Sequence, residues 1–118
     1  MDMKKGLGTK GEEAASEHLL GKGYDIIQRN YRFGKRGEID IVAKKGERLV
    51  FVEVKTRTSP LMEPEEAITQ KKLRQLRRVV QGYLFERDMG ECDVQFDIVA
   101  VIPEGTGFRI RHTEDIYS

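Results

Sequence analysis

The residues that most constrain the fold are 48–56, which read Arg-Leu-Val-Phe-Val-Glu-Val-Lys-Thr. Leu49 through Val52 are all apolar, and side chains alternate in direction along a strand, so both faces of such a strand would be apolar. A run of this kind is typical of a central strand that is covered from both sides. The chain is therefore expected to form an α/β fold in which helices flank a sheet.

The remaining pattern predicts the elements around this strand. Apolar residues at helical spacing predict two helices, at residues 7–21 and roughly 65–87. Other apolar runs predict strands at 38–44, 94–102 and 108–112, and a strand or an extended arm at 24–33. Gly46 marks a hairpin turn before strand 48–56, residues 58–64 are expected to form a loop, and Pro103 is expected to stop strand 94–102. The second helix lies between strands 48–56 and 94–102, which predicts a βαβ crossover. A chain of 118 residues is long enough for one domain, over residues 1–118, with a central mixed sheet of about five strands.

The location of the protein is expected to be cytoplasmic. Its one cysteine, Cys92, cannot form an intrachain disulfide, so the fold does not need an oxidising compartment. Residues 1–10 are polar and do not resemble a secretory signal. No apolar run approaches the roughly 20 residues that cross a bilayer, so no membrane association is expected.

The net charge of +1 does not by itself indicate a nucleic-acid partner, but the basic residues are clustered. One group lies in the middle of the chain and a second on the predicted long helix: Arg29, Arg32, Lys35 and Arg36, then Lys71, Lys72, Arg74, Arg77 and Arg78. Such local basic faces can bind phosphates even when the whole protein is nearly neutral.

Three charged side chains are expected to meet on two neighbouring strands. Glu53 and Lys55 point the same way from the apolar strand, and burying charge is costly unless it is paired or binds a metal. A hairpin around Gly46 pairs residues whose numbers sum to about 93, which places Asp40 opposite Glu53. Two adjacent carboxylates repel each other, and an oxygen-rich pair of this kind suits Mg²⁺ or Mn²⁺.

Lys55 beside two carboxylates should keep its proton. We therefore expect it to stabilise charge on a scissile phosphate or to position the attacking water, and not to act as the general base in its resting state. The metal would supply the nucleophile by lowering the pKa of a bound water.

The spacing of Asp40 and Glu53-Val54-Lys55 resembles the PD-(D/E)XK nuclease signature. A fuller resemblance is to the YraN-like family of small bacterial proteins, which are similar to archaeal Holliday junction resolvases. It extends over nearly the whole chain, in these blocks: Gly11-Glu12-Glu13-Ala14-Ala15, Gly23-Tyr24, Arg29-Asn30-Tyr31-Arg32, Gly37-Glu38-Ile39-Asp40, Phe51-Val52-Glu53-Val54-Lys55-Thr56-Arg57, Glu66-Ala67-Ile68 with Lys72, and Phe96-Asp97-Ile98-Val99-Ala100-Val101.

This resemblance implies a restriction-endonuclease-like core and a metal-dependent endonuclease that acts on DNA. It places Asp40, Glu53 and Lys55 in the active site, with Glu12 as an accessory acid that joins Asp40 and Glu53 around the metal. By analogy with resolvases, it also implies branched DNA as the substrate and a homodimer. The candidate contacts to the DNA backbone are Arg29, Arg32, Arg36, Lys72 and Arg74.

Each assignment has a structural alternative. Glu53 and Lys55 form a solvent-facing ion pair if the sheet is covered on one side only. Glu12 is also explained as a first-turn acid favoured by the helix dipole, and Lys72 as a side chain whose stem lies on the core while its amine reaches water. For the whole protein, the alternatives are a nucleic-acid-binding module of the same fold without turnover and a protein-interaction domain.

Four other residues are expected to be structural. Asp97 alternates with apolar residues, which predicts a structural ion pair with an arginine. His18 and His112 have no His, Cys or acid at zinc-ligand spacing in the sequence, so no zinc site is predicted from them. Cys92 has no triad partner and is expected to be inert.

Overall fold

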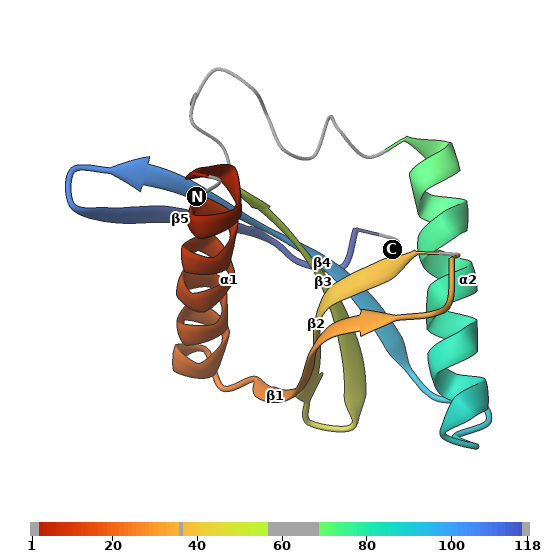
Figure 1. Ribbon diagram of the computed structural model, residues 1–118. Coiled ribbons are helices and arrows are strands. Elements are labelled where there is room, and N and C mark those ends of the chain that lie inside the picture. The colour runs from red at the N-terminus through yellow and green to blue at the C-terminus, as the bar shows by residue number, and fades with distance from the viewer. Residues whose placement is uncertain (1–2, 36, 57–68, 117–118) are drawn as a thin grey trace.

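The structure is a computed structural model that describes residues 3–35, 37–56 and 69–116. Its elements follow in the order α1 (Met3–Gly21), β1 (Asp25–Arg32), β2 (Glu38–Lys45), β3 (Arg48–Thr56), α2 (Gln70–Glu86), β4 (Val94–Glu104) and β5 (Gly107–Thr113). The five strands form one sheet in sequence order, β1-β2-β3-β4-β5. Figure 1 shows α1 and α2 on opposite sides of this sheet. The result confirms the expected α/β class and is consistent with a restriction-endonuclease-like core.

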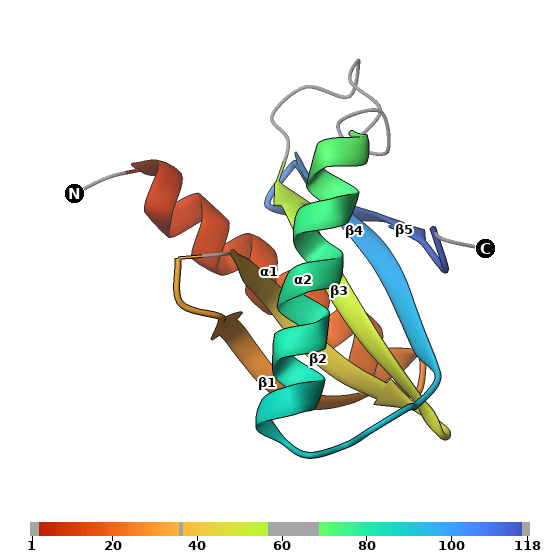
Figure 2. The same ribbon diagram turned by 90° about the vertical axis from the view of Figure 1, so that its right-hand side faces the viewer.

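The sheet is mixed because one connection crosses over it. β3 and β4 pair in parallel, whereas the other neighbouring strands pair antiparallel. α2 joins β3 to β4 and lies in front of the sheet in Figure 2, which confirms the predicted βαβ crossover. The register between β2 and β3 is also as predicted, since Ile41 pairs with Val52 and Val42 with Phe51.

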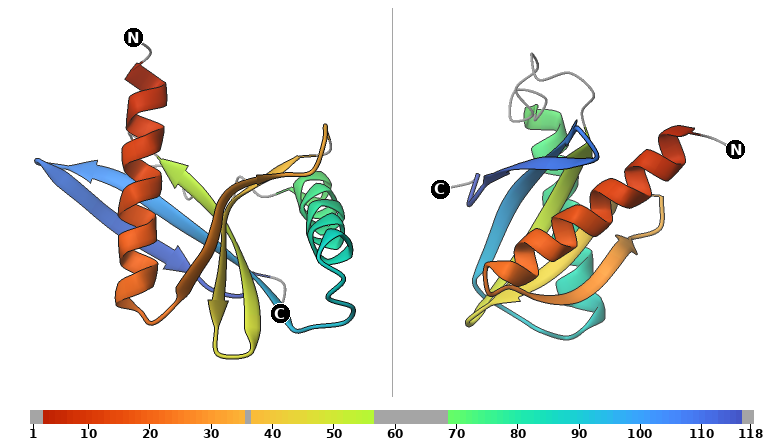
Figure 3. Two further views of the ribbon diagram at one scale, coloured as in Figure 1. Left: turned by 60° about the horizontal axis from the view of Figure 1, so that its bottom comes forward. Right: turned by 90° about the vertical axis from the view of Figure 1, so that its left-hand side faces the viewer.

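The core has two layers, one on each face of the sheet. Phe51 of β3 packs on the α2 side, in a cluster that includes Val79 and Tyr83. Val50 and Val52 pack on the α1 side with Leu19. Figure 3 shows α1 lying across that second face, with α2 behind the sheet in the right-hand view. β3 is therefore the central strand covered from both sides that its composition predicts.

Three predicted element ends were wrong. α1 begins at Met3 and not at residue 7, because hydrogen bonds set a helix end and apolar spacing does not mark it. α2 begins at Gln70, because Thr69 is extended (φ −91°, ψ 165°) and its side chain accepts a hydrogen bond from the Lys72 N–H. β4 continues to Glu104 through Pro103, which lies beyond the last residue that pairs with β3, so its missing N–H breaks no bond in that ladder.

The alternation of side chains along β2 is broken at Asp40. Ile39, Ile41 and Ala43 were expected on one face, but Ile39 packs in the α2-side cluster and the other two pack in the α1-side cluster. Ile41 forms the last pair with β3, and the neighbouring strand β1 has its own irregularity, at Asn30, whose φ is +56°. Regular pairing between β2 and β3 therefore ends next to Asp40, close to the irregular backbone of the edge strand β1.

The backbone of α2 at Gly82 packs directly against the ring of Phe33, which follows β1. A Cβ on Gly82 of α2 would lie 2.6 Å from the ring of Phe33. Because Gly82 has no side chain, α2 can pack this close to the β1–β2 hairpin.

Several predicted features lie outside the described residues: Arg36, the loop at 58–64 and residues 65–68 of the predicted long helix. Within the described ranges, neither helix is long and apolar enough to span a bilayer.

Candidate functional site

Asp40 lies where β2 separates from β3. Its Oδ2 atom accepts a hydrogen bond from the Val54 backbone N–H at 2.7 Å. Asp40 is one residue, and Val54 two residues, beyond the Ile41–Val52 pair that ends the regular ladder. The carboxylate thus takes the place of a backbone carbonyl that β2 no longer supplies. This bond ties the first acid of the predicted site to the strand that carries the other two predicted residues.

Glu53 and Lys55 of β3 meet Lys72 of α2. The Oε1 atom of Glu53 lies 3.0 Å from Lys55 Nζ and 3.5 Å from Lys72 Nζ, and the Glu53 side chain is only 12% exposed. A mostly buried carboxylate between two amines is not the solvent-facing pair of the structural alternative. The structure also shows where Lys72 reaches, since its amine contacts the site.

Glu12 approaches the same region from α1. A Cβ added to Gly11 would collide with the Thr56 side chain, so α1 packs closely on the end of β3. The Glu12 carboxylate is held by Arg29, at 3.4 Å, and Glu13 pairs with the same guanidinium. Glu12 is therefore near the site and engaged in an ion pair.

Burial and the neighbouring acids both affect the pKa of Asp40. Burial is the main cause that raises the pKa of Asp40 to about 7, and the hydrogen bond from Val54 acts in the opposite direction. The charges of Glu53, Glu12 and Glu38 raise it further. The group formed by Asp40, Glu53, Lys55 and Lys72, with Glu12 beside it, is called the acid–lysine site below.

The donor set of this site fits a hard divalent cation. One oxygen of Asp40 is used by Val54, and the two amines lie on Oε1 of Glu53, which leaves the second oxygen of each carboxylate without a contact to the described residues. Mg²⁺ is usually held by one or two carboxylates together with water and substrate phosphate, which matches Asp40 and Glu53. Glu12 does not join them in a compact group of three ligands among the described residues.

Of the predicted DNA contacts, some form ion pairs with acids of this chain and one does not. Arg29 and Arg32 are paired with acids, Arg29 with Glu12 and Glu13 and Arg32 with Glu38 at 3.2 Å. Lys72 is paired with Glu53. Arg74 lies exposed on α2 and forms no ion pair with the residues that the structure describes, whereas Arg36 is outside them.

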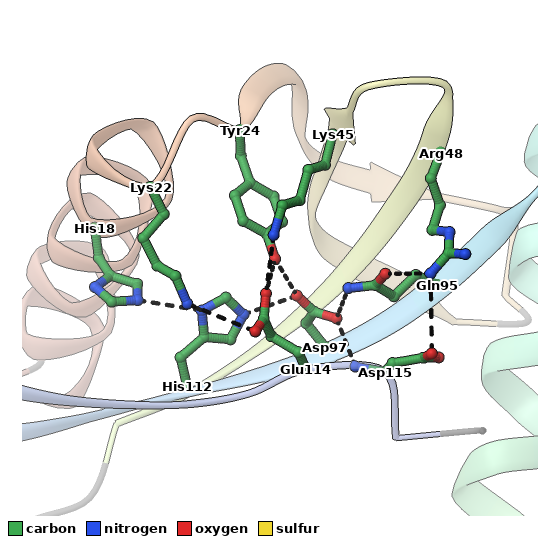
Figure 4. A network of polar contacts seen from close by, with 10 residues as sticks. All are labelled: His18, Lys22, Tyr24, Lys45, Arg48, Gln95, Asp97, His112, Glu114 and Asp115. Atoms are coloured by element: carbon green, nitrogen blue, oxygen red, sulfur yellow. Dashed lines mark hydrogen bonds and ion pairs between the residues drawn. The ribbon is translucent and has the colours of Figure 1, made fainter.

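A second polar cluster lies near the C-terminal end of α1, on the opposite side of the sheet from α2 (Figure 4). Asp97 of β4 is buried, and its Oδ2 lies 2.7 Å from His112 Nε2 and accepts a hydrogen bond from the Tyr24 hydroxyl at 3.1 Å. The same hydroxyl lies 2.6 Å from Glu114 Oε1, so the two carboxylates share its single proton. The Nδ1 atom of His112 lies 3.2 Å from His18 Nε2.

This cluster corrects two predictions. The side chain that pairs with Asp97 is a histidine and not an arginine. His112 does have acids beside it, because ligand atoms of Asp97, His112 and Glu114 all lie within 4.8 Å of one another and form a group that could hold a metal ion. The sequence signal was the His112-x-Glu114 spacing at the end of the last strand, but only the pairing of β4 with β5 brings Asp97 to it.

Hydrogen bonds already satisfy the carboxylate of Asp97. Its other oxygen accepts from the Gln95 side chain at 2.8 Å and from the Asp115 N–H at 3.0 Å. Burial opposes ionisation of Asp97, but the bonds from His112, Asp115 and Gln95 outweigh it and lower the pKa of Asp97. The arrangement therefore holds the C-terminal segment on the sheet without any further ligand.

Comparison with known proteins points to one family. The profile of the uncharacterised protein family UPF0102 matches residues 11–101. The UPF0102 protein of Christiangramia forsetii is 41% identical over 112 residues, which cover 94% of this chain and 92% of that protein. The UPF0102 protein of Caldicellulosiruptor saccharolyticus is 48% identical over 99 residues, which cover 83% of each.

Among solved structures, SfsA of Pyrococcus furiosus in complex with Ca²⁺ matches with a TM-score of 0.38 and 16% sequence identity. The match covers 94% of this chain and 63% of that chain.

Proposed function

The chain belongs to the UPF0102 family, whose name assigns no reaction, and from the acid–lysine site we propose that it is a metal-dependent endonuclease acting on DNA. The observation that carries this proposal is the Asp40–Val54 hydrogen bond. It fixes one carboxylate beside the strand that presents a second carboxylate, Glu53, and two amines. Two acids with adjacent cations are the groups that phosphodiester hydrolysis needs for a metal and for a charged phosphate.

Each residue of the site has a proposed role. Asp40 and Glu53 would hold Mg²⁺ or Mn²⁺, which when bound supplies Lewis-acid activation of water and of the phosphate. Lys55, 3.0 Å from Glu53, would donate hydrogen bonds to the phosphate as negative charge builds on its oxygens. Lys72 would hold a neighbouring phosphate oxygen once the metal balances the charge of Glu53. Glu12 would orient a water molecule from the α1 side.

A second candidate function is a nucleic-acid-binding module without turnover. The observation in its favour is that the amines of Lys55 and Lys72 both pair with the carboxylate of Glu53. In that case Lys55 and Lys72 are a structural network that a metal does not displace.

Cleavage assays with and without Mn²⁺ separate the two functions. The substrates are duplex, single-stranded, flap and four-way-junction DNA, and the proteins are wild type, Asp40→Asn, Glu53→Gln and Lys55→Met. A matched control is Glu47→Gln, which removes an exposed carboxylate from the β2–β3 turn. An endonuclease should cleave with Mn²⁺ and lose at least about 100-fold in rate in the three site variants, but not in the control. DNA binding by all five proteins with no cleavage supports the binding module.

The junction substrate tests the finer proposal that branched DNA is preferred, which rests on the resemblance to resolvases. A resolvase makes paired cuts on a two-fold symmetric junction, so a homodimer is proposed with it. Sedimentation of the free protein and of its junction complex measures this. A monomer in both would remove the resolvase proposal and leave the nuclease proposal intact.

A further inference from the structure

A groove runs between the first half of α2 and the turn that joins β1 to β2. It has a volume of about 920 Å³, and its described lining is made of Lys35, Lys71, Arg74, Gln75 and Arg78. The four residues from α2 are spaced i, i+3, i+4 and i+7, so they form one stripe along the helix. Lys35 faces that stripe from the turn. We call this the basic groove.

The position of the turn depends on a glycine. Gly37 has φ +144°, and a Cβ there would lie 3.1 Å from both the Gln75 and the Val79 side chains. The turn can therefore lie directly on α2, which brings Lys35 to the basic groove. The groove is thus formed by two packed elements and not by side chains of one helix alone.

The four cations of the basic groove are not neutralised. Lys35, Lys71, Arg74 and Arg78 form no ion pair with any residue in the described ranges. Most other described basic residues do form one, namely Lys22, Arg29, Arg32, Lys45, Arg48, Lys55, Lys72, Arg87 and Arg109. The first turn of α2 contains no acidic residue, and the partial positive charge of a helix N-terminus adds to the same potential. Unpaired like charges at this spacing repel one another, and a polyanion in the groove would remove that repulsion.

The chemistry of the lining indicates which polyanion fits. From Lys71 to Arg78 the helix rises by about 10 Å, enough to reach more than one phosphate of a nucleic-acid strand. The described lining contains no aromatic side chain, whereas proteins that hold single strands use aromatic rings on which bases stack. Cations alone contact phosphates and carry no base information.

We propose that the basic groove holds the phosphodiester backbone of a DNA double helix, independently of its sequence. Lys72 follows Lys71 in α2 and contacts Glu53, so a backbone in the groove leads to the acid–lysine site. The inference deepens the proposed nuclease function and rests on it for DNA as the ligand, but binding can be measured without cleavage.

The test is binding of the full-length protein to a fluorescent duplex and to one of its single strands, in EDTA, over a range of salt. Arg74→Gln/Arg78→Gln is compared with Lys10→Gln/Lys44→Gln, which removes two exposed cations that also form no ion pair within the described residues but lie outside the groove. The groove variant should bind duplex about tenfold more weakly, and the slope of log affinity against log salt should fall by about two. The control variant should change affinity less than about twofold, and wild type should bind duplex more tightly than single strand.

Equal losses in both variants would show attraction by net charge only and would overturn the inference. Tighter binding of the single strand, or no duplex binding by wild type, would overturn it as well. The two proposals fail separately: a wild type that binds duplex through the groove but never cleaves refutes the nuclease alone. A groove variant that binds normally, while wild type cleaves, refutes the groove alone. Circular dichroism of each variant confirms that it is folded.

Discussion

The Asp40 carboxylate and the Val54 backbone N–H are joined by a hydrogen bond of 2.7 Å across the point where β2 leaves β3. Backbone pairing between β2 and β3 has ended at this point, and the Asp40 side chain supplies a hydrogen bond to β3 in its place. This bond holds the mostly buried Asp40 carboxylate close to the strand that carries Glu53. The energetic consequence of that position can be measured without any substrate.

Asp40→Asn should stabilise the metal-free protein at high pH. The folded-state pKa of Asp40 is raised to about 7, mainly by burial, so its ionisation opposes folding, and stability is lost as pH rises from about 4 through 7. The asparagine oxygen still accepts from Val54 but carries no charge. In EDTA at pH 8 the variant should gain about 1–3 kcal/mol in the free energy of unfolding by urea, with no gain at pH 4. A less stable variant at pH 8 would contradict this account, and Mn²⁺ should stabilise wild type but not the variant.

Lys72→Met should increase affinity for Mn²⁺. The Lys72 amine lies 3.5 Å from Glu53 Oε1 and competes with a metal for that carboxylate, and methionine keeps the length of the side chain without its charge. Titration calorimetry should show an affinity about three- to tenfold higher. Lys71→Met removes the charge of the exposed neighbour, which has no contact with Glu53, and should change affinity less than about twofold. Weaker metal binding in Lys72→Met would mean that the lysine supports the metal site.

Asp97→Asn should destabilise the protein at neutral pH by about 3 kcal/mol, because a buried carboxylate that accepts from four donors is replaced by a group that must also donate. The folded-state pKa of Asp97 is lowered, so its contribution is present above its unfolded pKa of about 4 and is lost as pH falls below that value. Urea unfolding should therefore show a difference from wild type that shrinks below about pH 4. Asp93→Asn, an exposed residue just before β4, should have almost no effect. An equal loss in both variants would argue against the buried network.

Gly82→Ala should lower the free energy of unfolding by about 1–3 kcal/mol, because the new Cβ would lie 2.6 Å from the Phe33 ring. Phe33→Leu in the same chain should recover part of the loss, which thermal unfolding of the two single variants and the double variant would measure. Gly21→Ala is the control, since a Cβ there meets nothing within 4 Å, and it should be neutral or slightly stabilising. If the two alanine variants behave alike, the contact with Phe33 does not limit the approach of α2.

Much of the fold follows from local patterns that a reader of the sequence can recognise. The unbroken apolar run of β3 requires cover on both faces, and a helix between β3 and β4 requires a crossover. The hairpin at Gly46 sets the predicted register, which pairs Ile41 with Val52, and Asp40 and Glu53 are the residues next to that pair. These features depend on periodicity and on short connections.

Other features depend on contacts between residues that are far apart in the chain, and only the tertiary structure decides them. The alternation of side chains along β2 breaks at Asp40, where β2 separates from β3. Lys72 reaches Glu53 only because α2 packs across the sheet. Asp97 finds His112 and Tyr24 through strand pairing and the packing of α1, and no spacing in the sequence encodes that meeting. The sequence thus determined which charges the chain carries and on which elements, whereas long-range packing determined which of them form ion pairs with one another in the described part of the chain.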